Sequence, residues 1–312
     1  MSVRCLIVDV LHESIGPLLK AINIDYDYRP DITREEIKEI IANYDGLIIR
    51  SKTRVDEDLI KGCKLKFVGR PGAGIDNLDQ VLLAKKGIEI LNAPKGNRDS
   101  VGEHTIGLLL NLLHNLTQAH HQVVTGTWDR EGNRGSELGS LTVGIYGYGN
   151  TGSALAQKLS GFGCRVIAYD KYLDNSDNNF AELVNLDTFF NETQVLSLHL
   201  PLTDETYHLA NFGFFKKFTH QLIFLNTSRG EIAPLKDIKK AIATTKIKLA
   251  GLDVLECEKL DKMNVHQTEV FNWLKESGKV IFTPHVAGWT DESYKRLNVV
   301  LVEKIVAFLD RG

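Results

Sequence analysis

The chain has 312 residues and a mass of 34.9 kDa, which suits about two domains. Hydrophobic residues make up 43% and charged residues 25%, a composition that excludes disordered, collagen-like and low-complexity chains. The net charge of -3 provides no basic footprint for nucleic acid, and no apolar run approaches the ~20 residues of a membrane span. We therefore expect neither a nucleic-acid nor a membrane partner.

The first part of the chain alternates strand-like and helix-like runs. Strand-like runs lie at residues 3–8, 46–49, 65–68 and 88–91, with turn residues between them. Thr33 and Glu36 have the spacing of a capping box, and an amphipathic run follows them. Strands that alternate with helices predict parallel pairing in an α/β sheet.

The second part repeats this alternation after a long helix. The capping-box pair Ser100 and Glu103 predicts a helix that continues to about Val124, and an exposed arm follows at residues 126–139. Strands are predicted at residues 141–146, 165–169, 195–200, 222–226, 249–252 and 280–283. A final amphipathic helix is capped near Thr290. The shared rhythm predicts two similar open sheets.

A glycine-rich turn lies between the predicted strand at 141–146 and a predicted helix at 153–159. Gly147, Gly149 and Gly152 form a GxGxxG motif, and Asp170 follows at the end of the next strand. This context is typical of a dinucleotide site, in which the helix N-terminus binds the pyrophosphate and the acid binds the ribose. A carboxylate at this position would repel a 2′-phosphate, so we predict NAD rather than NADP.

Three further segments follow predicted strands, at residues 226–230, 252–258 and 283–290. They contain an arginine, several acids and a histidine, and ligands bind at this edge of an open α/β sheet. An arginine can clamp a carboxylate through two hydrogen bonds, and a histidine can take a hydroxyl proton. A carboxylate behind the histidine would fix its tautomer. The set suits a 2-hydroxy acid.

Together these segments resemble the D-2-hydroxyacid dehydrogenase family over almost the whole chain. The resemblance implies a catalytic triad of Arg229, Glu258 and His285. Asp253 and Glu256 lie close to Glu258 and compete with it for the acidic role, and the resemblance selects Glu258. Lys259 replaces the usual proline of the family, and the segment 260–278 looks longer than in many relatives.

The resemblance also implies binding residues. Those implied for the cofactor NAD are Gly147, Gly149, Asn150, Thr151, Gly152, Asp170, His199, Thr227 and Asp253. Those implied for the substrate are Arg50, Ser51, Arg70, Ala73, Gly74 and Asn97. Asn150 and Thr151 stand where the family often has Arg-Ile, which puts cofactor affinity rather than cofactor identity in question. For His199, a contact with the nicotinamide side and a purely structural place at the sheet edge both stay open.

The implied fold consists of two Rossmann-like, doubly wound parallel-sheet domains. A flavodoxin-like catalytic domain of residues 1–98 and 286–312 carries an inserted NAD-binding domain of residues 99–285. Within the family the chain most resembles the phosphoglycerate dehydrogenases, so the predicted substrate is 3-phosphoglycerate, a phosphorylated 2-hydroxy acid. The alternatives are a glyoxylate or hydroxypyruvate reductase and, from another class, an NADH-sensing corepressor-like binding protein.

The remaining expectations concern partners and surroundings. The long helix and the arm suggest, by analogy, a homodimer formed through the nucleotide domains. Four scattered cysteines indicate reduced thiols in a cytoplasmic protein. His120 and His121 are adjacent on a predicted helix and point about 100° apart, so they make a poor pair of ligands and no metal is expected.

Overall fold

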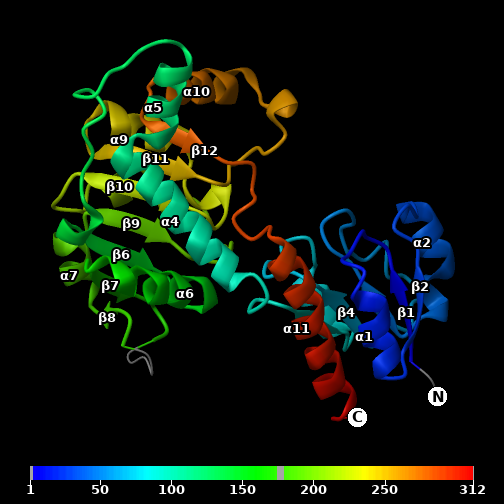
Figure 1. Cartoon of the computed structure of the whole chain (residues 1–312). Helices are drawn as coiled ribbons and strands as arrows, with labels where there is room; N and C mark the ends of the chain where they lie inside the picture. Colours follow the sequence, from blue (N-terminus) through cyan, green and yellow to red (C-terminus); the bar gives the residue numbers. More distant parts are fainter. Residues whose placement is uncertain (1–2, 174–178, 312) are drawn as a thin grey trace. The chain divides into compact units, whose positions relative to one another are not determined.

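The computed structural model describes residues 3–173 and 179–311. The chain divides into two compact units (Figure 1). Unit 1 comprises Met1–Arg98 and Trp289–Gly312, and unit 2 comprises Asp99–Gly288. The domain boundaries predicted from the sequence lie after residue 98 and after residue 285. Each unit has its own parallel β-sheet, which confirms the predicted fold class.

Unit 1 contains a five-stranded sheet in the order β2-β1-β3-β4-β5, and all pairings are parallel. This is the flavodoxin-like strand order. Successive side chains of a strand point to opposite faces, so Cys5 and Ile7 join one core while Leu6 and Val8 join the other. The strands are β1 (Arg4–Ile7), β2 (Asp25–Tyr28), β3 (Gly46–Ile48), β4 (Phe67–Arg70) and β5 (Glu89–Asn92).

Helices cover both faces of this sheet. One face is covered by α1 (Ile15–Ala21) and by α11 (Asp291–Leu309), which the chain contributes from its C-terminal part. The other face is covered by α2 (Arg34–Ile40), η1 (Ile41–Asn43) and α3 (Gln80–Lys85). The predicted caps are confirmed, because Thr33 caps α2 and Thr290 caps α11.

Unit 2 contains a seven-stranded parallel sheet in the order β12-β11-β10-β9-β6-β7-β8. The first strand of the unit, β6, lies beside β9 and β7, so the strand order reverses there. Ligands bind outside the carboxyl ends of strands at such a switch point. The strands are β6 (Thr142–Tyr146), β7 (Arg165–Tyr169), β8 (Glu182–Leu183), β9 (Val195–Leu198), β10 (Leu222–Asn226), β11 (Ile247–Leu252) and β12 (Val280–Phe282).

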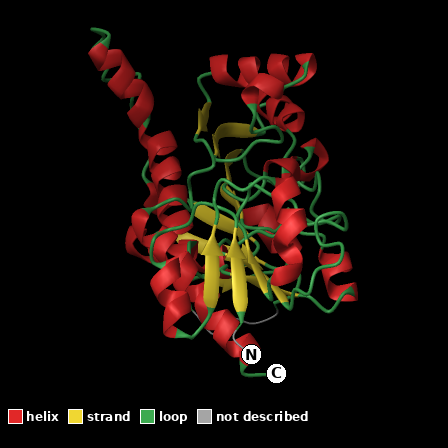
Figure 2. Ribbon diagram, turned by 90° about the vertical axis from the view of Figure 1, so that its right-hand side faces the viewer, coloured by secondary structure: helices red, strands yellow, loops and turns green. Residues whose placement is uncertain are grey.

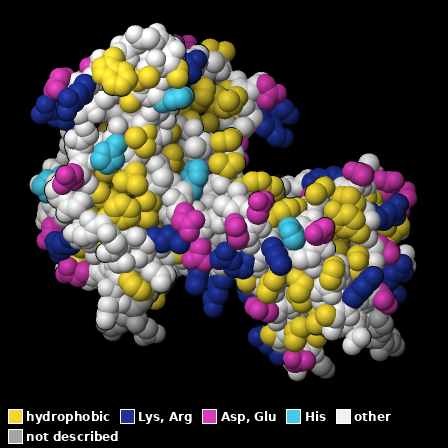
Figure 3. Space-filling view, viewed as in Figure 1, with side chains coloured by type: hydrophobic (Ala, Val, Ile, Leu, Met, Phe, Trp, Pro, Cys, Tyr) yellow, Lys and Arg dark blue, Asp and Glu magenta, His cyan; other side chains and the backbone are white. Residues whose placement is uncertain are grey.

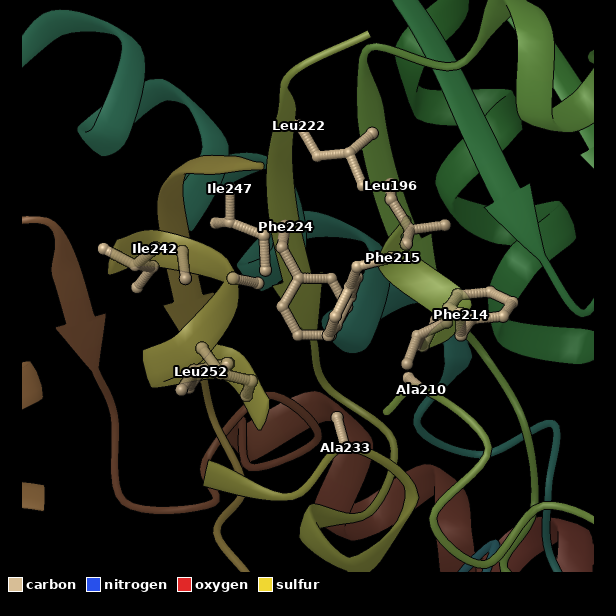
Figure 4. Close-up of a cluster of buried hydrophobic side chains, with 14 of the residues drawn as sticks. Leu196, Ala210, Phe214, Phe215, Leu222, Phe224, Ala233, Ile242, Ile247 and Leu252 are labelled. Atoms are coloured by element: carbon tan, nitrogen blue, oxygen red, sulfur yellow. The ribbon is translucent and has the colours of Figure 1, made fainter. Parts of the chain in front are cut away.

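Helices again flank the strands (Figure 2). One face of the unit 2 sheet packs against α4 (Arg98–His114) and α6 (Asn150–Leu159). The other packs against α7 (Leu186–Glu192), α8 (Phe212–Phe215), α9 (Leu235–Ala243) and α10 (Val265–Glu276). In the core of this second face, the rings of Phe215 and Phe224 lie edge to face with centroids 5.1 Å apart (Figure 4).

The segment at residues 260–278 contributes to the helices on this second face. It contains η5 (Leu260–Lys262) and α10, whose Val270 and Leu274 are buried in the same core as α9. The segment thus forms a helix that is packed in unit 2. Unit 2 also contains the 3-10 helices η2 (Leu138–Ser140), η3 (Ser160–Phe162) and η4 (Gly230–Ile232).

The prediction of one helix over residues 100–124 is wrong. Asn115 adopts a left-handed backbone with φ 53° and separates α4 from α5 (Leu116–Val124). The side chain of Asn111 exchanges two hydrogen bonds with Thr117, which stabilises the break. The predicted cap at Ser100 is also wrong, because α4 already begins at Arg98 and Ser100 lies inside it.

Among the described residues, none of the helices combines the length and the apolar character that a membrane span needs. The predicted arm after α5 is exposed along most of its length.

Candidate active site

The glycine-rich turn joins β6 to α6 at the switch point of the unit 2 sheet. Gly147 has φ +96°, and a Cβ there would collide with the backbone carbonyl of His199. A Cβ on Gly152 would collide with the carbonyl of Gly147, so the third glycine lets the helix pack on the turn. Gly149 differs, since an added Cβ there meets nothing within 4 Å. The turn therefore keeps open space at its second glycine.

The N-terminus of α6 faces this open space without a side-chain cap from its N-cap residue, Gly149. The free N–H groups of a helix N-terminus attract phosphate oxygens. Asp170 follows β7, and its carboxylate accepts hydrogen bonds from the backbone N–H groups of Tyr148 (2.8 Å) and Tyr172 (2.9 Å). These bonds fix the acid beside the glycine turn. An open glycine, an uncapped helix and an oriented acid fit a dinucleotide.

His199 lies behind the glycine turn at the end of β9. It is buried, with Nε2 2.8 Å from Ser197 Oγ and Nδ1 3.2 Å from Thr151 Oγ1. Burial lowers the pKa of His199 from 6.5 to about 4, so its ring is neutral near pH 7. Of the two roles that the sequence leaves open for this residue, these contacts support the structural one, because His199 ties Thr151 to the sheet.

The predicted acid and base lie together in unit 2. His285 Nδ1 is 2.8 Å from Glu258 Oε1, and both side chains are about half exposed. His285 has a left-handed backbone, with φ 55°, which is uncommon for a residue other than glycine. An exposed imidazole whose Nδ1 is held by a carboxylate presents its Nε2 to an incoming ligand. The pair can accept or donate a proton.

Glu256, the other candidate for the acidic role, is engaged elsewhere. Its Oε2 accepts the backbone N–H of Leu235 at 2.7 Å, at the first turn of α9, and its Oε1 lies 3.7 Å from Nε2 of His208. A carboxylate at this position stabilises the helix N-terminus. Of the two glutamates, the one in contact with His285 is Glu258.

Arg229 lies on a loop that folds back at the end of β10. The side chain of Asn226 donates to the carbonyl of Arg229 at 2.9 Å and accepts the N–H of Ser228 at 3.0 Å. The guanidinium Nη1 of Arg229 donates to the carbonyl of Ser228 at 2.7 Å. Thr227 Oγ1 lies 3.2 Å from Thr105 Oγ1, so helix α4 supports the same loop. The loop is positioned on both sides before any substrate binds.

Asp253 organises the loop that carries His285. Its side chain has no exposed surface, Oδ1 accepts the N–H of Val286 and Oδ2 accepts the N–H of Ala287, both at 2.9 Å. The hydroxyl of Thr283 donates to Oδ1 at 2.5 Å. Both carboxylate oxygens are thus bonded to the loop. Asp253 is predicted from the sequence to bind the cofactor, but these bonds favour a role in which Asp253 positions the loop.

The pKa of Asp253 reflects these contacts. Burial acts to raise it, but hydrogen bonds from His104, Thr283, Ala287 and Val286 together hold the pKa below its ordinary value. The Asp253 carboxylate is therefore a buried anion that is stabilised by hydrogen bonds from protein donors. His104, on α4, belongs to this set although no motif singled it out. No spacing in the sequence indicates it, because its partners Thr283 and Asp253 lie far away along the chain.

The predicted substrate residues lie in unit 1. The guanidinium of Arg50 stacks on the ring of Trp289, 3.9 Å from the ring centroid, and lies 5.1 Å from the ring centroid of Tyr294. The backbone N–H of Arg50 donates a hydrogen bond to the carboxylate of Asp9. Arg70 donates from Nε to the carbonyl of Arg50 at 2.9 Å and from Nη1 to the carbonyl of Gly74. Both arginines already have partners within unit 1.

The other predicted substrate residues are placed as follows. Ser51 is exposed, and the carbonyl of Ala73 accepts a hydrogen bond from Asn92 at 2.8 Å. Asn97 has a buried Oδ1 without a hydrogen-bond partner among the described residues. The bond between Asn92 and Ala73, with that between Arg70 and Gly74, shapes the turn after β4.

Comparison with known proteins gives similarities over most of the chain. The family model described as the NAD binding domain of D-isomer specific 2-hydroxyacid dehydrogenases matches residues 106–287. The chain is 35% identical to a hydroxypyruvate reductase from Thermotoga maritima, over 88% of each chain. It is 31% identical to a D-3-phosphoglycerate dehydrogenase from Archaeoglobus fulgidus, over 97% of this chain but only 56% of that relative.

Among solved structures, a D-lactate dehydrogenase from Aquifex aeolicus, crystallised with NAD and lactic acid, superimposes with a TM-score of 0.82. The sequence identity is 25%, and the match covers 98% of this chain and 95% of the other.

Proposed function

The chain belongs to the D-isomer-specific 2-hydroxyacid dehydrogenase family, and from this premise we propose that it interconverts a small 2-hydroxy acid and its 2-keto acid with NAD. The observation that carries the proposal is the 2.8 Å contact of Glu258 with His285, in the same unit as the glycine turn. The proposed site residues are those predicted from the sequence, with Asp253 and His199 acting through other residues.

NAD is the proposed cofactor. Bound at the glycine turn, it would accept hydride from C2 of the hydroxy acid or return it to the keto acid. The N-terminus of α6 would hold the pyrophosphate, and the Asp170 carboxylate would accept hydrogen bonds from the ribose hydroxyls. The same negative charge would repel the 2′-phosphate of NADP.

The protein's own residues would handle the proton and the carboxylate. Because Glu258 holds Nδ1 of His285, that nitrogen carries the hydrogen and Nε2 is left to take the substrate hydroxyl proton. The Glu258 carboxylate then stabilises the imidazolium that forms. Arg229 would clamp the substrate carboxylate and the developing charge on the C2 oxygen.

The leading substrate is 3-phosphoglycerate, which would place the enzyme in serine biosynthesis. This choice is supported by relatives named D-3-phosphoglycerate dehydrogenase that are 31–33% identical over most of this chain. Hydroxypyruvate is the second candidate. It is favoured by the Thermotoga relative, and by the engagement of Arg50 and Arg70, which leaves neither guanidinium wholly available for a phosphate.

The assembly and location complete the proposal. Exposed apolar side chains on α5 and the segment after it support a homodimer through unit 2. The four cysteines of the chain are free thiols, which supports a location in the reducing cytoplasm.

The experiment measures loss of NADH absorbance with phosphohydroxypyruvate, hydroxypyruvate and glyoxylate in parallel. A kcat/KM at least about 100-fold higher for the phosphorylated acid assigns 3-phosphoglycerate, since paired charge contacts discriminate by that order. A preference for hydroxypyruvate assigns the second candidate. If no acid reacts while NADH still binds, the dehydrogenase proposal is wrong and an NADH-binding protein replaces it.

Two matched variants test the mechanism within the same assay. Glu258→Ala removes the partner of His285, so kcat should fall by about 100-fold. Glu256→Ala removes the contact at the start of α9, so kcat should persist while stability falls by about 1 kcal/mol. Equal kcat values in the two variants would contradict the assignment of Glu258.

A further inference from the structure

We propose that His104 is a positioning residue that holds the loop of His285 through Thr283 and Asp253, an inference that rests on the proposed function. His104 Nε2 lies 3.0 Å from Thr283 Oγ1 and 3.5 Å from Asp253 Oδ1. Thr283 lies just before His285 in the chain, and Asp253 accepts hydrogen bonds from the loop. His104 comes from helix α4. The contact ties two segments that are 179 residues apart in sequence.

The direction of these hydrogen bonds follows from the hydrogens available. The Thr283 hydroxyl has a single hydrogen, and it donates this hydrogen to Asp253 Oδ1 at 2.5 Å. Toward His104 the hydroxyl oxygen therefore accepts, so Nε2 of His104 must carry a hydrogen and donate it. His104 thus supplies a donor beside a buried carboxylate, where an unpaired acceptor would be costly.

The carboxylate and the backbone of Asp253 both accept hydrogen bonds from the loop of His285, so they link His104 to that loop. The Asp253 carbonyl accepts the N–H of His285 at 2.8 Å, and its carboxylate accepts the N–H groups of Val286 and Ala287. His285 needs such support because its φ of 55° is a conformation that most side chains avoid. His104 is therefore two hydrogen bonds away from the backbone of the proposed base.

Helix α4 supports both catalytic loops from adjacent positions. His104 contacts Thr283 in the loop of His285, and Thr105 contacts Thr227 in the loop of Arg229. Thr105 is itself fixed, because its hydroxyl donates to the carbonyl of Val101 at 2.7 Å. One rigid turn of helix thus sets the positions of the proposed acid–base residue and the proposed carboxylate clamp.

His104 is also reachable by a small molecule, which makes the proposal testable. Its side chain is 24% exposed and lines a cavity of about 560 Å³ with Gly107, Leu108, Phe282 and Thr283. This volume is ample for an imidazole ring. Removing the side chain of His104 would enlarge this cavity next to Thr283, so added imidazole could bind there and restore the missing donor.

The experiment compares His104→Leu, His104→Gln and Thr283→Val, with His220→Leu, an exposed histidine before β10, as the matched control. The leucine variant should lose about tenfold in kcat while the dissociation constant for NADH stays within about twofold, because the loop moves and the glycine turn does not. The glutamine variant, whose amide nitrogen can replace Nε2 as a donor, should recover most of the loss. The double variant should lose no more than Thr283→Val alone, because that change already removes both the acceptor of His104 and the bond from Thr283 to Asp253.

Two further readouts separate positioning from packing. In His104→Ala, imidazole should raise kcat by at least about threefold, and the control variant should not respond. Hydrogen exchange of the Val286 and Ala287 amides should accelerate in the leucine variant and stay slow in the glutamine variant. The exchange readout needs no turnover, so it tests the inference even if the proposed dehydrogenase activity is absent.

The inference is overturned if His104→Leu keeps full kcat and slow exchange. Equal losses in the leucine and glutamine variants would also overturn it, since they would indicate packing alone. Additive losses in the double variant would show that His104 and Thr283 act separately.

Discussion

At the scale of single residues, His199 makes stability depend on pH in a defined window. The ring is neutral in the folded state, with a pKa of about 4, whereas in the unfolded chain it titrates at 6.5. Between these values the unfolded state binds more protons, so stability is lost as the pH falls. The loss between pH 7 and pH 5 should be about 2 kcal/mol.

Urea unfolding at the two pH values measures this loss. His199→Gln cannot ionise and retains groups able to bond Ser197 and Thr151, so its free energy of unfolding should fall less than that of the wild type by about 2 kcal/mol. The exposed His220→Gln variant should behave as the wild type does. Parallel pH dependence in the wild type and His199→Gln would show that the ring is not held neutral.

At the scale of elements, the turn between β6 and α6 separates a binding glycine from a packing glycine. Gly149→Ala adds a methyl group to open space, so the melting temperature should persist while the dissociation constant for NADH rises roughly tenfold. Gly152→Ala forces the same methyl group against the carbonyl of Gly147 and should cost about 1–3 kcal/mol of stability. Calorimetry and fluorescence titration of NADH measure the two effects. A large loss of stability in Gly149→Ala would contradict this division.

The elements also show where sequence patterns suffice. Buried strands such as β10 consist of apolar residues between turn signals, and their prediction is confirmed. The patterns do not predict edge strands β2 and β8, because β2 alternates Asp with Tyr and β8 has only two residues. They also do not predict the break between α4 and α5. It depends on one left-handed asparagine, a choice that local propensity does not determine.

The candidate site divides in the same way. Residues with a motif, such as Gly147, Arg229 and His285, could be predicted because a strand end and a recognisable residue type coincide. Their supports could not, because the contact between His104 and Thr283 joins segments distant in sequence. The same holds for the stacking of Arg50 on Trp289, which reduces the availability of Arg50 to a phosphate and which no spacing rule predicts.

At the scale of the whole molecule, the exposed side of α5 leads to a prediction about assembly. No residue of α5 is buried. The apolar side chains of Leu116, Val123 and Val124 on this helix are 55%, 51% and 64% exposed, and Trp128, which follows the helix, is 84% exposed. Figure 3 shows hydrophobic side chains exposed on the face of unit 2 along which α4 and α5 lie in Figure 1. Clustered apolar exposure marks interaction surfaces, and a second copy of the chain is the occupant we propose.

Light scattering after size exclusion should therefore give twice the chain mass of 34.9 kDa. Replacing Val124 and Trp128 together by glutamate puts charges into the proposed interface, so the mass should fall to that of one chain and the melting temperature should become independent of concentration. Val81→Glu is the control, because Val81 is 82% exposed on α3 in unit 1 and should leave the dimer intact. A monomeric wild type would contradict the proposed dimer, because the apolar side chains of α5 would then stay exposed to solvent. Dissociation of the Val81→Glu control as well would contradict a dimer formed through α5, because that substitution lies on α3 in unit 1.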